Sequence, residues 1–244
     1  MFANTNSSQY QALDWLVNND ELKLCSDDDT LTQRYILAVL YFETNGDEWF
    51  NCTRLQDSTC AFLSAAAECR WGGIECDSTN SVARINIDQN NLRGPIPKEL
   101  GALSRLYELD LQQNELTGTI PESIATLSGL TYLDLDVNHL VGPIPEGIYD
   151  LPLLAALDLD TNQLTGTIST RIGQLSDLYV AQFDKNKMTG TIPTEIGGLL
   201  KLGYLTIVGN SFSDGVPQQV CDSQALVYAS CGVCTIDGCC ADCL

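Results

Sequence analysis

Residues 106–121 read LYELDLQQNELTGTIP, and residues 130–145 repeat the pattern as LTYLDLDVNHLVGPIP. The repeat has a period of 24 residues, and its first, fourth and sixth positions are apolar in every unit. Six units begin at Val82, Leu106, Leu130, Leu154, Leu178 and Leu202. A fixed period of this kind predicts a solenoid in which each unit packs against its neighbours and the chain presents a long surface to a partner.

Each unit is expected to contribute one short strand and one tight turn. Its first seven positions alternate between apolar and polar residues, so the apolar side chains face a common core. Stacked strands lie about 4.7–4.9 Å apart, and equivalent residues therefore form columns along the stack. The ninth position is Asn in all six units: Asn90, Asn114, Asn138, Asn162, Asn186 and Asn210. We expect these amides to bond backbone groups at the turn, not to contact a ligand.

The second half of the unit carries Gly-x-Ile-Pro, as in residues 94–97, 118–121, 142–145 and 190–193. The whole pattern, L-x-x-L-x-L-x-x-N-x-L-x-G-x-I-P, resembles the plant-type leucine-rich repeats of receptor-like kinases and polygalacturonase-inhibiting proteins. The stretch CRWGGIEC at residues 69–76 resembles that family's N-terminal cap motif, C-x-W-x-G-V-x-C, with Ile in place of Val. The resemblance implies an α/β solenoid: a right-handed leucine-rich-repeat arc with a concave parallel β-sheet and a short strand or polar helix on its convex side.

Three parts of the chain follow from this pattern. We expect an N-terminal helical cap at residues 1–81, six repeats at residues 82–221 and a Cys-rich C-terminal cap at residues 222–244. Apolar residues at helical spacing in residues 10–16 and 31–42 predict cap helices that seal the first coil. The repeat departs locally from its pattern at Ser169 (Pro elsewhere), at Asp214 (Gly elsewhere) and at Ala181.

The eleven cysteines occur only near the two ends of the chain, which suggests disulfide-closed caps and an oxidising compartment. Glycosylation sequons at Asn6 and Asn51 agree with export. Residues 1–10 are polar and do not form a signal peptide, and no stretch is apolar enough to span a membrane. We interpret the chain as a mature or excised extracellular domain, secreted or tethered to the cell surface by a segment outside it.

Ten cysteines are expected in disulfides: Cys52, Cys60, Cys69, Cys76, Cys221, Cys231, Cys234, Cys239, Cys240 and Cys243. In the N-terminal cap we pair Cys69 with Cys76 and Cys52 with Cys60, which leaves Cys25 as the odd thiol. The C-x2-C-x5-C-x2-C spacing of residues 231–243 is also compatible with a zinc site. The secretory features favour a disulfide cap, whose six cysteines allow 15 pairings. We therefore predict no metal and no cofactor.

The formal net charge is -20, and no Lys or Arg occurs between Arg105 and Arg171. Such a surface repels phosphate backbones and anionic lipids, which argues against nucleic-acid and membrane-surface binding. It favours cationic partners, metal ions or simple solubility.

Acidic and aromatic side chains are expected on the concave face. The fifth and seventh positions of the strands carry seven aspartates: Asp88, Asp110, Asp134, Asp136, Asp158, Asp160 and Asp184. Tyrosines occupy the second and third positions: Tyr107, Tyr132, Tyr179 and Tyr204. The aspartates could be a solvated face, a binding strip for a basic protein or peptide, or less favourably a divalent-cation site. The tyrosines suit protein contacts and sugar rings, or equally packing at the strand edge.

Enzyme and ice-binding functions fit the sequence less well. The single histidine, His139, has Asp136 nearby but no serine in a nucleophile-elbow context. Paired aspartates such as Asp134 and Asp136 could serve a glycosidase, but we expect an open sheet to leave them hydrated, with ordinary pKa values. Thr-Gly-Thr occurs at residues 117–119, 165–167 and 189–191, but an interrupted ladder disfavours ice binding.

The sequence therefore predicts a non-enzymatic, extracellular ligand-recognition module. Its ligand is expected to be a protein, peptide or glycan of basic character, bound at the acidic concave face. The family resemblance implies that the module is either a receptor ectodomain or a secreted inhibitor of a wall-degrading enzyme. The alternative is a structural or adhesive component of a cell wall.

Overall fold

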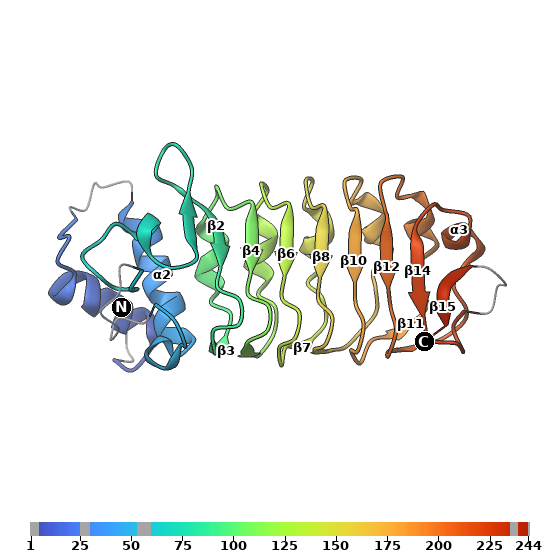
Figure 1. Cartoon of the computed structure of the whole chain (residues 1–244), viewed down its shortest axis with the longest axis horizontal. Coiled ribbons are helices and arrows are strands. Elements are labelled where there is room, and N and C mark those ends of the chain that lie inside the picture. The colour runs from blue at the N-terminus through green and yellow to red at the C-terminus, as the bar shows by residue number, and fades with distance from the viewer. Residues whose placement is uncertain (1–4, 25–29, 53–59, 235–238, 244) are drawn as a thin grey trace.

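The computed structural model describes residues 5–24, 30–52, 60–234 and 239–243, with side chains of residues 241–243 left aside. Cys25, the expected odd thiol, lies outside the described residues. The chain runs along one axis, with its two ends at opposite ends of the molecule (Figure 1). Within the described part, no helix is both long and apolar enough to cross a membrane.

The helical elements are short except in the N-terminal cap. They are α1 (Ser8–Asp14), the π-helical η1 (Trp15–Asn19), α2 (Leu31–Glu43), and α3 (Gln218–Cys221), with 3-10 helices η2 (Gly46–Glu48), η3 (Glu68–Arg70), η4 (Lys98–Ala102), η5 (Glu122–Thr126), η6 (Glu146–Asp150), η7 (Thr170–Gln174) and η8 (Thr194–Gly198). The last five of these 3-10 helices each occupy the same place in successive repeats, on the side of the solenoid opposite the main sheet (Figure 1).

The strands form one long sheet and three short ones. They are β1 (Ile74–Cys76), β2 (Val82–Asn86), β3 (Arg93–Pro95), β4 (Glu108–Asp110), β5 (Glu115–Thr117), β6 (Tyr132–Asp134), β7 (Val141–Gly142), β8 (Ala156–Asp158), β9 (Gln163–Leu164), β10 (Val180–Gln182), β11 (Thr189–Gly190), β12 (Tyr204–Thr206), β13 (Ser211–Phe212), β14 (Leu226–Ala229) and β15 (Cys240–Cys243).

The long sheet has nine strands in the order β1-β2-β4-β6-β8-β10-β12-β14-β15, and only β1 pairs antiparallel. Residues pair with the residue 24 positions later, as Leu109 does with Leu133 and Leu133 with Leu157, so each repeat position forms a column. Figure 1 shows these strands side by side and facing the viewer. We call the solvent-facing side of this sheet the sheet face; it is the face that the sequence analysis called concave.

The core is a single ladder of apolar side chains between the long sheet and the 3-10 helices. Leu109, Leu133 and Leu157 from the fourth column are fully buried. In the fifth repeat the small Ala181 occupies this column beside a fully buried Phe183, and the sheet register is kept. The predicted solenoid, helical N-terminal cap and C-terminal disulfides are confirmed.

The Asn ladder links each repeat to the preceding one. Oδ1 of Asn138 accepts a hydrogen bond of 2.9 Å from the backbone N of Leu116, in the previous repeat. Its Nδ2 donates to the carbonyl oxygens of Leu111, Leu135 and Asp136 at 2.9–3.2 Å. Asn114, Asn162 and Asn186 make equivalent bonds, and all are buried. The amides have the structural role expected from the sequence.

The eighth position of each repeat, directly before the ladder Asn, has a left-handed backbone conformation. Gln89, Gln113, Val137, Thr161 and Lys185 have φ between 46° and 53°, and Gly209 has φ 71°. This conformation costs a β-branched residue such as Val137 more than it costs Asn or Gly. Asp214, which replaces a repeat Gly, also takes a left-handed φ of 61°. The turn geometry is therefore imposed by the repeat and not by local residue preference.

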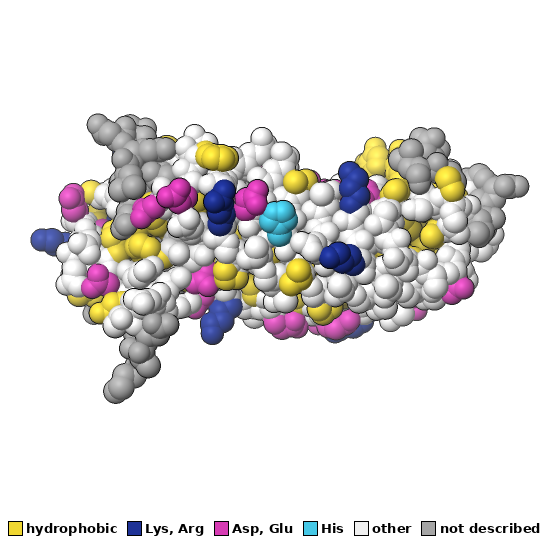
Figure 2. All heavy atoms as spheres, turned by 90° about the horizontal axis from the view of Figure 1, so that it is seen from below, with side chains coloured by type: hydrophobic (Ala, Val, Ile, Leu, Met, Phe, Trp, Pro, Cys, Tyr) yellow, Lys and Arg dark blue, Asp and Glu magenta, His cyan; other side chains and the backbone are white. Residues whose placement is uncertain are grey.

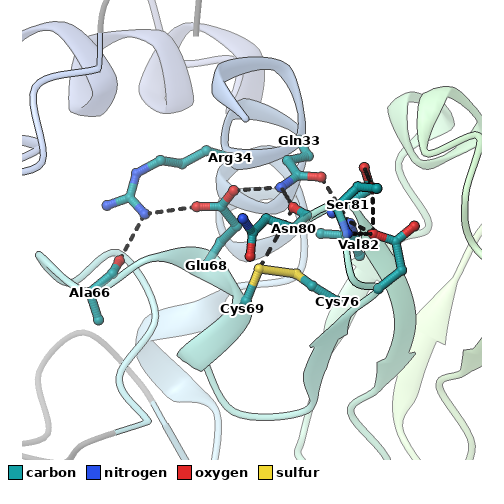
Figure 3. Close-up of a disulfide and its surroundings, with 11 residues drawn as sticks. Gln33, Arg34, Ala66, Glu68, Cys69, Cys76, Asn80, Ser81 and Val82 are labelled. Carbon is teal, nitrogen blue, oxygen red and sulfur yellow. Dashed lines mark hydrogen bonds and ion pairs between the residues drawn. A yellow bond between two sulfur atoms is a disulfide. The ribbon is translucent and has the colours of Figure 1, made fainter. Parts of the chain in front are cut away.

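The N-terminal cap closes the first repeat through helix α2. Arg34, on α2, is fully buried and bonds both carboxylate oxygens of Asp20 at 2.7 Å and Oε2 of Glu68 at 3.3 Å. Next to it, Gln33 donates to Glu68 and accepts from the backbone N of Val82 at 2.9 Å, beside a disulfide (Figure 3). This network joins the cap directly to strand β2.

Nine cysteines of the described part of the chain, in both caps, are disulfide-bonded. Cys52 bonds Cys60 and Cys69 bonds Cys76, which are the pairs expected from the sequence. In the C-terminal cap, Cys221 bonds Cys239 and Cys234 bonds Cys240. Cys231 is also disulfide-bonded, so three of the four cysteines with zinc-like spacing are used in disulfides.

The C-terminal cap continues the long sheet. β14 pairs in parallel with β12, and Tyr204 faces Leu226 in the register. The 22-residue spacing of these two residues departs from the repeat period, and the cap has no ladder Asn, so the sequence pattern did not indicate this strand. With β15 paired to β14 and β1 paired to β2, the long sheet is three strands longer than the six repeats supply.

Candidate ligand-binding face

Two neighbouring columns of polar side chains cross the sheet face. The fifth-position column is in register from β2 to β12 and reads Asn86, Asp110, Asp134, Asp158, Gln182 and Thr206. The seventh-position column lies just beyond the strand ends and reads Asp88, Gln112, Asp136, Asp160, Asp184 and Val208. The structure therefore brings together the aspartates of the second, third and fourth repeats and leaves Asp88 at the edge.

The aspartates of the fifth column are held by the backbone of their own repeat. Asp134 accepts a hydrogen bond of 3.1 Å from the backbone N of Asp136, and Asp158 accepts one of 3.2 Å from that of Asp160. Asp110 and Asp134 are only 5% and 3% exposed, so little of either carboxylate is open to a ligand, and ligand binding by these two residues stays a prediction. The neighbouring side chains cover them.

Neutral donors lie between the carboxylates. The hydroxyl of Tyr132 donates to Asp134 at 2.7 Å, and Nε2 of Gln182 donates to Asp158 at 2.6 Å. Nε2 of Gln112 lies 3.3 Å from Asp134 and 3.3 Å from Asp110. These amides were not predicted as part of the site, although they occupy the same two columns and share their periodicity. They reduce the repulsion between the carboxylates.

We call Asp136, Asp158 and Asp160, from the third and fourth repeats, the acidic centre. All three side chains are half-buried on the sheet face. Oδ1 of Asp136 is buried and accepts no hydrogen bond. Among the described residues, no ion pair involves the acidic centre. A cation arriving at this point would therefore meet carboxylates that have no other counter-charge.

Burial raises the pKa of Asp136 to about 7, and the charges of Asp134 and Asp160 add to this effect. Burial and the nearby Asp134 charge raise the pKa of Asp158 to about 8. The pKa values of Asp110, Asp134 and Asp184 are also raised, each chiefly by burial. The expectation that an open sheet would leave these carboxylates hydrated, with ordinary pKa values, is therefore wrong. The bulky columns on either side exclude enough water to disfavour full ionisation.

One carboxylate oxygen from each of Asp134, Asp136 and Asp158 lies within 4.8 Å of the other two. Oxygen ligands at such spacing suit a hard divalent cation. An acidic cluster alone does not identify a metal site, however, and the absence of a metal stays a prediction.

The tyrosines differ in their surroundings. Tyr132 is half-buried against the acidic columns, whereas Tyr179 and Tyr204 are 51% and 39% exposed. The rings of Tyr179 and Tyr204 meet edge to face, with centroids 5.8 Å apart. Tyr107 is 42% exposed and shares the second column with Tyr179, three strands away. The structure therefore groups Tyr179 and Tyr204 and separates them from Tyr107.

The remaining candidate residues are not part of the acidic centre, although Asp184 follows Asp160 in the seventh-position column. Asp184 accepts a 2.6 Å hydrogen bond from the backbone N of Val208. His139 contacts the exposed Glu115, with Nε2 2.9 Å from Oε2, and not Asp136. The sequon residues Asn6 and Asn51 are exposed in the N-terminal cap, and the backbone N of Asn51 donates to Asn90 at 2.7 Å.

The threonines of the Thr-Gly-Thr segments lie on a different face. They belong to the short sheets β3–β5, β7–β9 and β11–β13 or follow them directly, and all six side chains are exposed. Figure 2 views this side of the solenoid, below the strands of Figure 1, and most of its surface is uncharged. Val141 and Pro143 interrupt the threonine columns in the third repeat, as expected from the sequence.

Comparisons with known proteins agree with the repeat pattern. Residues 80–140 and 104–164 match the family described as Leucine rich repeat. A plant peptide hormone receptor, RGFR1, in complex with RGF2, is 35% identical over 57% of this chain and 23% of that chain, with a TM-score of 0.56. A plant ice-binding protein is 27% identical to this chain. The match covers 82% of this chain and 63% of the ice-binding protein, with a TM-score of 0.71.

A third similar structure is the BIR2 ectodomain from Arabidopsis thaliana, which is 27% identical over 77% of this chain and 95% of that chain, with a TM-score of 0.58. This chain thus spans less than two thirds of the hormone receptor and of the ice-binding protein. Its structural relatives include leucine-rich-repeat ectodomains such as that of BIR2, in keeping with the expectation of a non-enzymatic module. By its repeats, its cap motif and these similarities, the chain is a leucine-rich-repeat solenoid that resembles the ectodomains of plant leucine-rich-repeat receptors.

Proposed function

We propose that the chain is an extracellular recognition module that binds a basic protein or peptide through its sheet face. The observation that carries this proposal is the acidic centre, because its half-buried carboxylates have no ion-pair partner among the described residues. A Lys or Arg side chain placed there would favour their ionised form and add charge-assisted hydrogen bonds. Complementary charge also speeds encounter and selects against acidic partners.

The similarity to RGFR1, which was solved in complex with RGF2, supports a ligand-binding role. Receptor ectodomain and secreted inhibitor both remain compatible with such a role, since both present a sheet to a partner. The exposed Asn6 and Asn51 are proposed glycosylation sites, as expected of an exported chain. Both lie in the N-terminal cap, so glycans there leave the acidic centre open.

A display library of random 12-residue peptides, panned against the immobilised chain, tests this function. We expect enriched peptides to be basic and to lose binding when Asp136, Asp158 and Asp160 are changed together to Asn. A parallel panel of neutral and acidic wall oligosaccharides tests the structural or adhesive alternative. Enrichment of no peptide, together with retention of an oligosaccharide, would favour that alternative.

Ice binding is a second candidate, favoured by the similarity to a plant ice-binding protein over most of this chain. The exposed Thr165, Thr167, Thr189 and Thr191 form two adjacent columns of uncharged side chains in the fourth and fifth repeats. An ice-recrystallisation assay with the wild type and with Thr167→Lys tests this function. Inhibition of recrystallisation by the wild type alone would support ice binding, and no inhibition by either protein would exclude it at the concentrations used.

A further inference from the structure

The third-position residues form one column across the sheet face, and its chemistry changes along the solenoid. The sheet register aligns them from β2 to β14 in the order Arg84, Glu108, Tyr132, Ala156, Val180, Tyr204 and Leu226. The column begins with charged residues, passes the acidic centre and ends in apolar side chains. A ligand that follows the solenoid axis therefore meets different chemistry at each end.

The charged end of the column is internally compensated. The guanidinium of Arg84 lies 2.8 Å from Oε1 of Glu75 and 2.7 Å from Oε1 of Glu108. These pairs join β1, β2 and β4. Because the charges at this end already face each other, it offers a ligand less net charge than the acidic centre does.

The opposite end is apolar and exposed. We call Tyr179, Tyr204 and Leu226 the apolar end; they are 51%, 39% and 45% exposed. The ring of Tyr179 occupies the space above Gly203, since a Cβ there would lie 2.6 Å from its Cε2. The edge-to-face contact between the two tyrosine rings fixes them further. The repeat thus holds an ordered aromatic surface where most strands of the sheet carry smaller or charged groups.

The distance between the acidic centre and the apolar end follows from the strand order. Two strand spacings separate β8, which carries Asp158, from β12, which carries Tyr204, and three separate β8 from β14. At about 4.8 Å per strand, these steps are roughly 10 and 14 Å. An extended peptide advances about 3.3 Å per residue, so three or four residues cover this distance.

We propose, building on the function proposed above, that the sheet face binds an extended peptide lying along the solenoid axis. The peptide places a Lys or Arg on the acidic centre and, three or four residues away, an aromatic or large aliphatic side chain on the apolar end. Charge complementarity selects the first residue, and burial of exposed Tyr204 and Leu226 selects the second.

Synthetic peptides test the spacing. A fluorescent 11-residue peptide of Gly, Ser and Thr carries one Lys and one Phe, separated by one, three, four or eight positions in both orders. Fluorescence anisotropy at low and physiological salt gives the dissociation constants. We expect the peptides with a separation of three or four, in one of the two orders, to bind at least 10-fold more tightly than all others.

Two variants assign the contacts. Tyr204→Ala combined with Leu226→Ala should reduce the preference for Phe at the favoured spacing to less than 3-fold, while dependence on Lys persists. Asp136→Asn, Asp158→Asn and Asp160→Asn together should remove the dependence on Lys instead. Circular dichroism confirms folding of each variant, as expected because the substituted side chains are on the surface.

The outcomes separate the two proposals. Basic peptides that bind the acidic centre without any preference in spacing, or with full affinity for the Tyr204 and Leu226 variant, overturn the inference and leave the proposed function standing. If no peptide binds more tightly to the wild type than to the acidic-centre variant, both proposals are overturned. Self-association of the chain through the apolar end, detected by sedimentation velocity and lost in the Tyr204 and Leu226 variant, also overturns the inference.

Discussion

The hydroxyl of Tyr132 donates a 2.7 Å hydrogen bond to Oδ2 of Asp134, two residues further along strand β6. This bond ties the third column of the sheet face to the fifth and helps to leave Asp134 only 3% exposed. Burial raises the pKa of Tyr132, and its bond to Asp134 raises it further, so the hydroxyl remains a donor throughout the physiological range. The covered Asp134 thereby contributes charge to the acidic centre without facing solvent itself.

Replacing this donor should weaken the fold. Tyr132→Phe leaves a buried carboxylate without its side-chain donor from the same strand, and we expect a loss of about 1–3 kcal/mol in the free energy of unfolding. Urea denaturation followed by circular dichroism measures the loss. Tyr107→Phe is the matched control, because Tyr107 is 42% exposed, and it should change stability by less than about 0.5 kcal/mol. Equal losses in the two variants would contradict this role of Tyr132.

The raised carboxyl pKa values predict that stability falls as pH rises. An unfolded Asp titrates near 3.9, whereas the folded-state pKa is about 7 for Asp136 and about 8 for Asp158. Between these values the folded chain binds more protons than the unfolded chain, so the free energy of unfolding decreases with pH. The stabilisation contributed by protonated Asp136 and Asp158 is fully present below about pH 4 and is lost as pH rises through 7 to 8.

Melting temperatures measured from pH 5 to 9 test this dependence. We expect a steady decrease for the wild type and a smaller decrease for Asp136→Asn combined with Asp158→Asn, because Asn is neutral at every pH. Glu122→Gln combined with Glu195→Gln removes two exposed carboxylates from the 3-10 helices. This variant should show the same decrease of melting temperature with pH as the wild type. A slope that is the same in all three proteins would show that the acidic centre is ordinarily hydrated.

The ladder amides should carry a large share of local stability. Asn138→Ala removes one bond accepted by Oδ1 and three donated by Nδ2, and leaves buried backbone groups without partners. At about 1–3 kcal/mol for each unsatisfied group, with relaxation and water recovering part, we expect a loss of about 2–5 kcal/mol. Gln113→Ala, at an exposed position of the preceding turn, provides the control for urea denaturation. A loss below 1 kcal/mol would show that the turn holds without its amide.

The left-handed turns offer a stabilising change. Val137 has φ 46° and Val141 does not have a positive φ, although both are 40% exposed. Asn tolerates the left-handed region better than a β-branched residue, so Val137→Asn should raise the free energy of unfolding by about 0.5–1 kcal/mol. Val141→Asn should not raise it. A decrease for Val137→Asn would mean that apolar contacts of Val137 outweigh its backbone strain.

The fold could be predicted from the sequence because the 24-residue period indicates where each strand and turn lies. The ladder Asn and the apolar fourth position recur in fixed register, and each has the same role in successive repeats. Strand β14 was not predicted because the spacing between Tyr204 and Leu226 differs from the 24-residue period. Its absence from the expected sheet also hid the apolar end, which depends on Leu226.

The site was predicted only in outline. The positions of Asp136 and Asp158 follow from the repeat, but their desolvation depends on how Tyr132, Gln112 and Gln182 pack over the columns. Side-chain cover of this kind arises between neighbouring repeats and is not encoded in the pattern of any one of them. For the same reason the sequence did not distinguish the covered Asp134 from the accessible acidic centre.

The central claim is that the acidic centre, and not the overall negative charge, binds a basic ligand. The most direct measurement compares the affinity of the tightest selected basic peptide for three proteins at physiological salt. One is the wild type, one has Asp136, Asp158 and Asp160 changed to Asn, and one has the exposed Glu122, Glu146 and Glu195 changed to Gln. In each variant, three carboxyl groups are replaced by neutral amides. We predict at least a 10-fold loss of affinity for the first variant and less than a 3-fold loss for the second; equal losses would contradict the account.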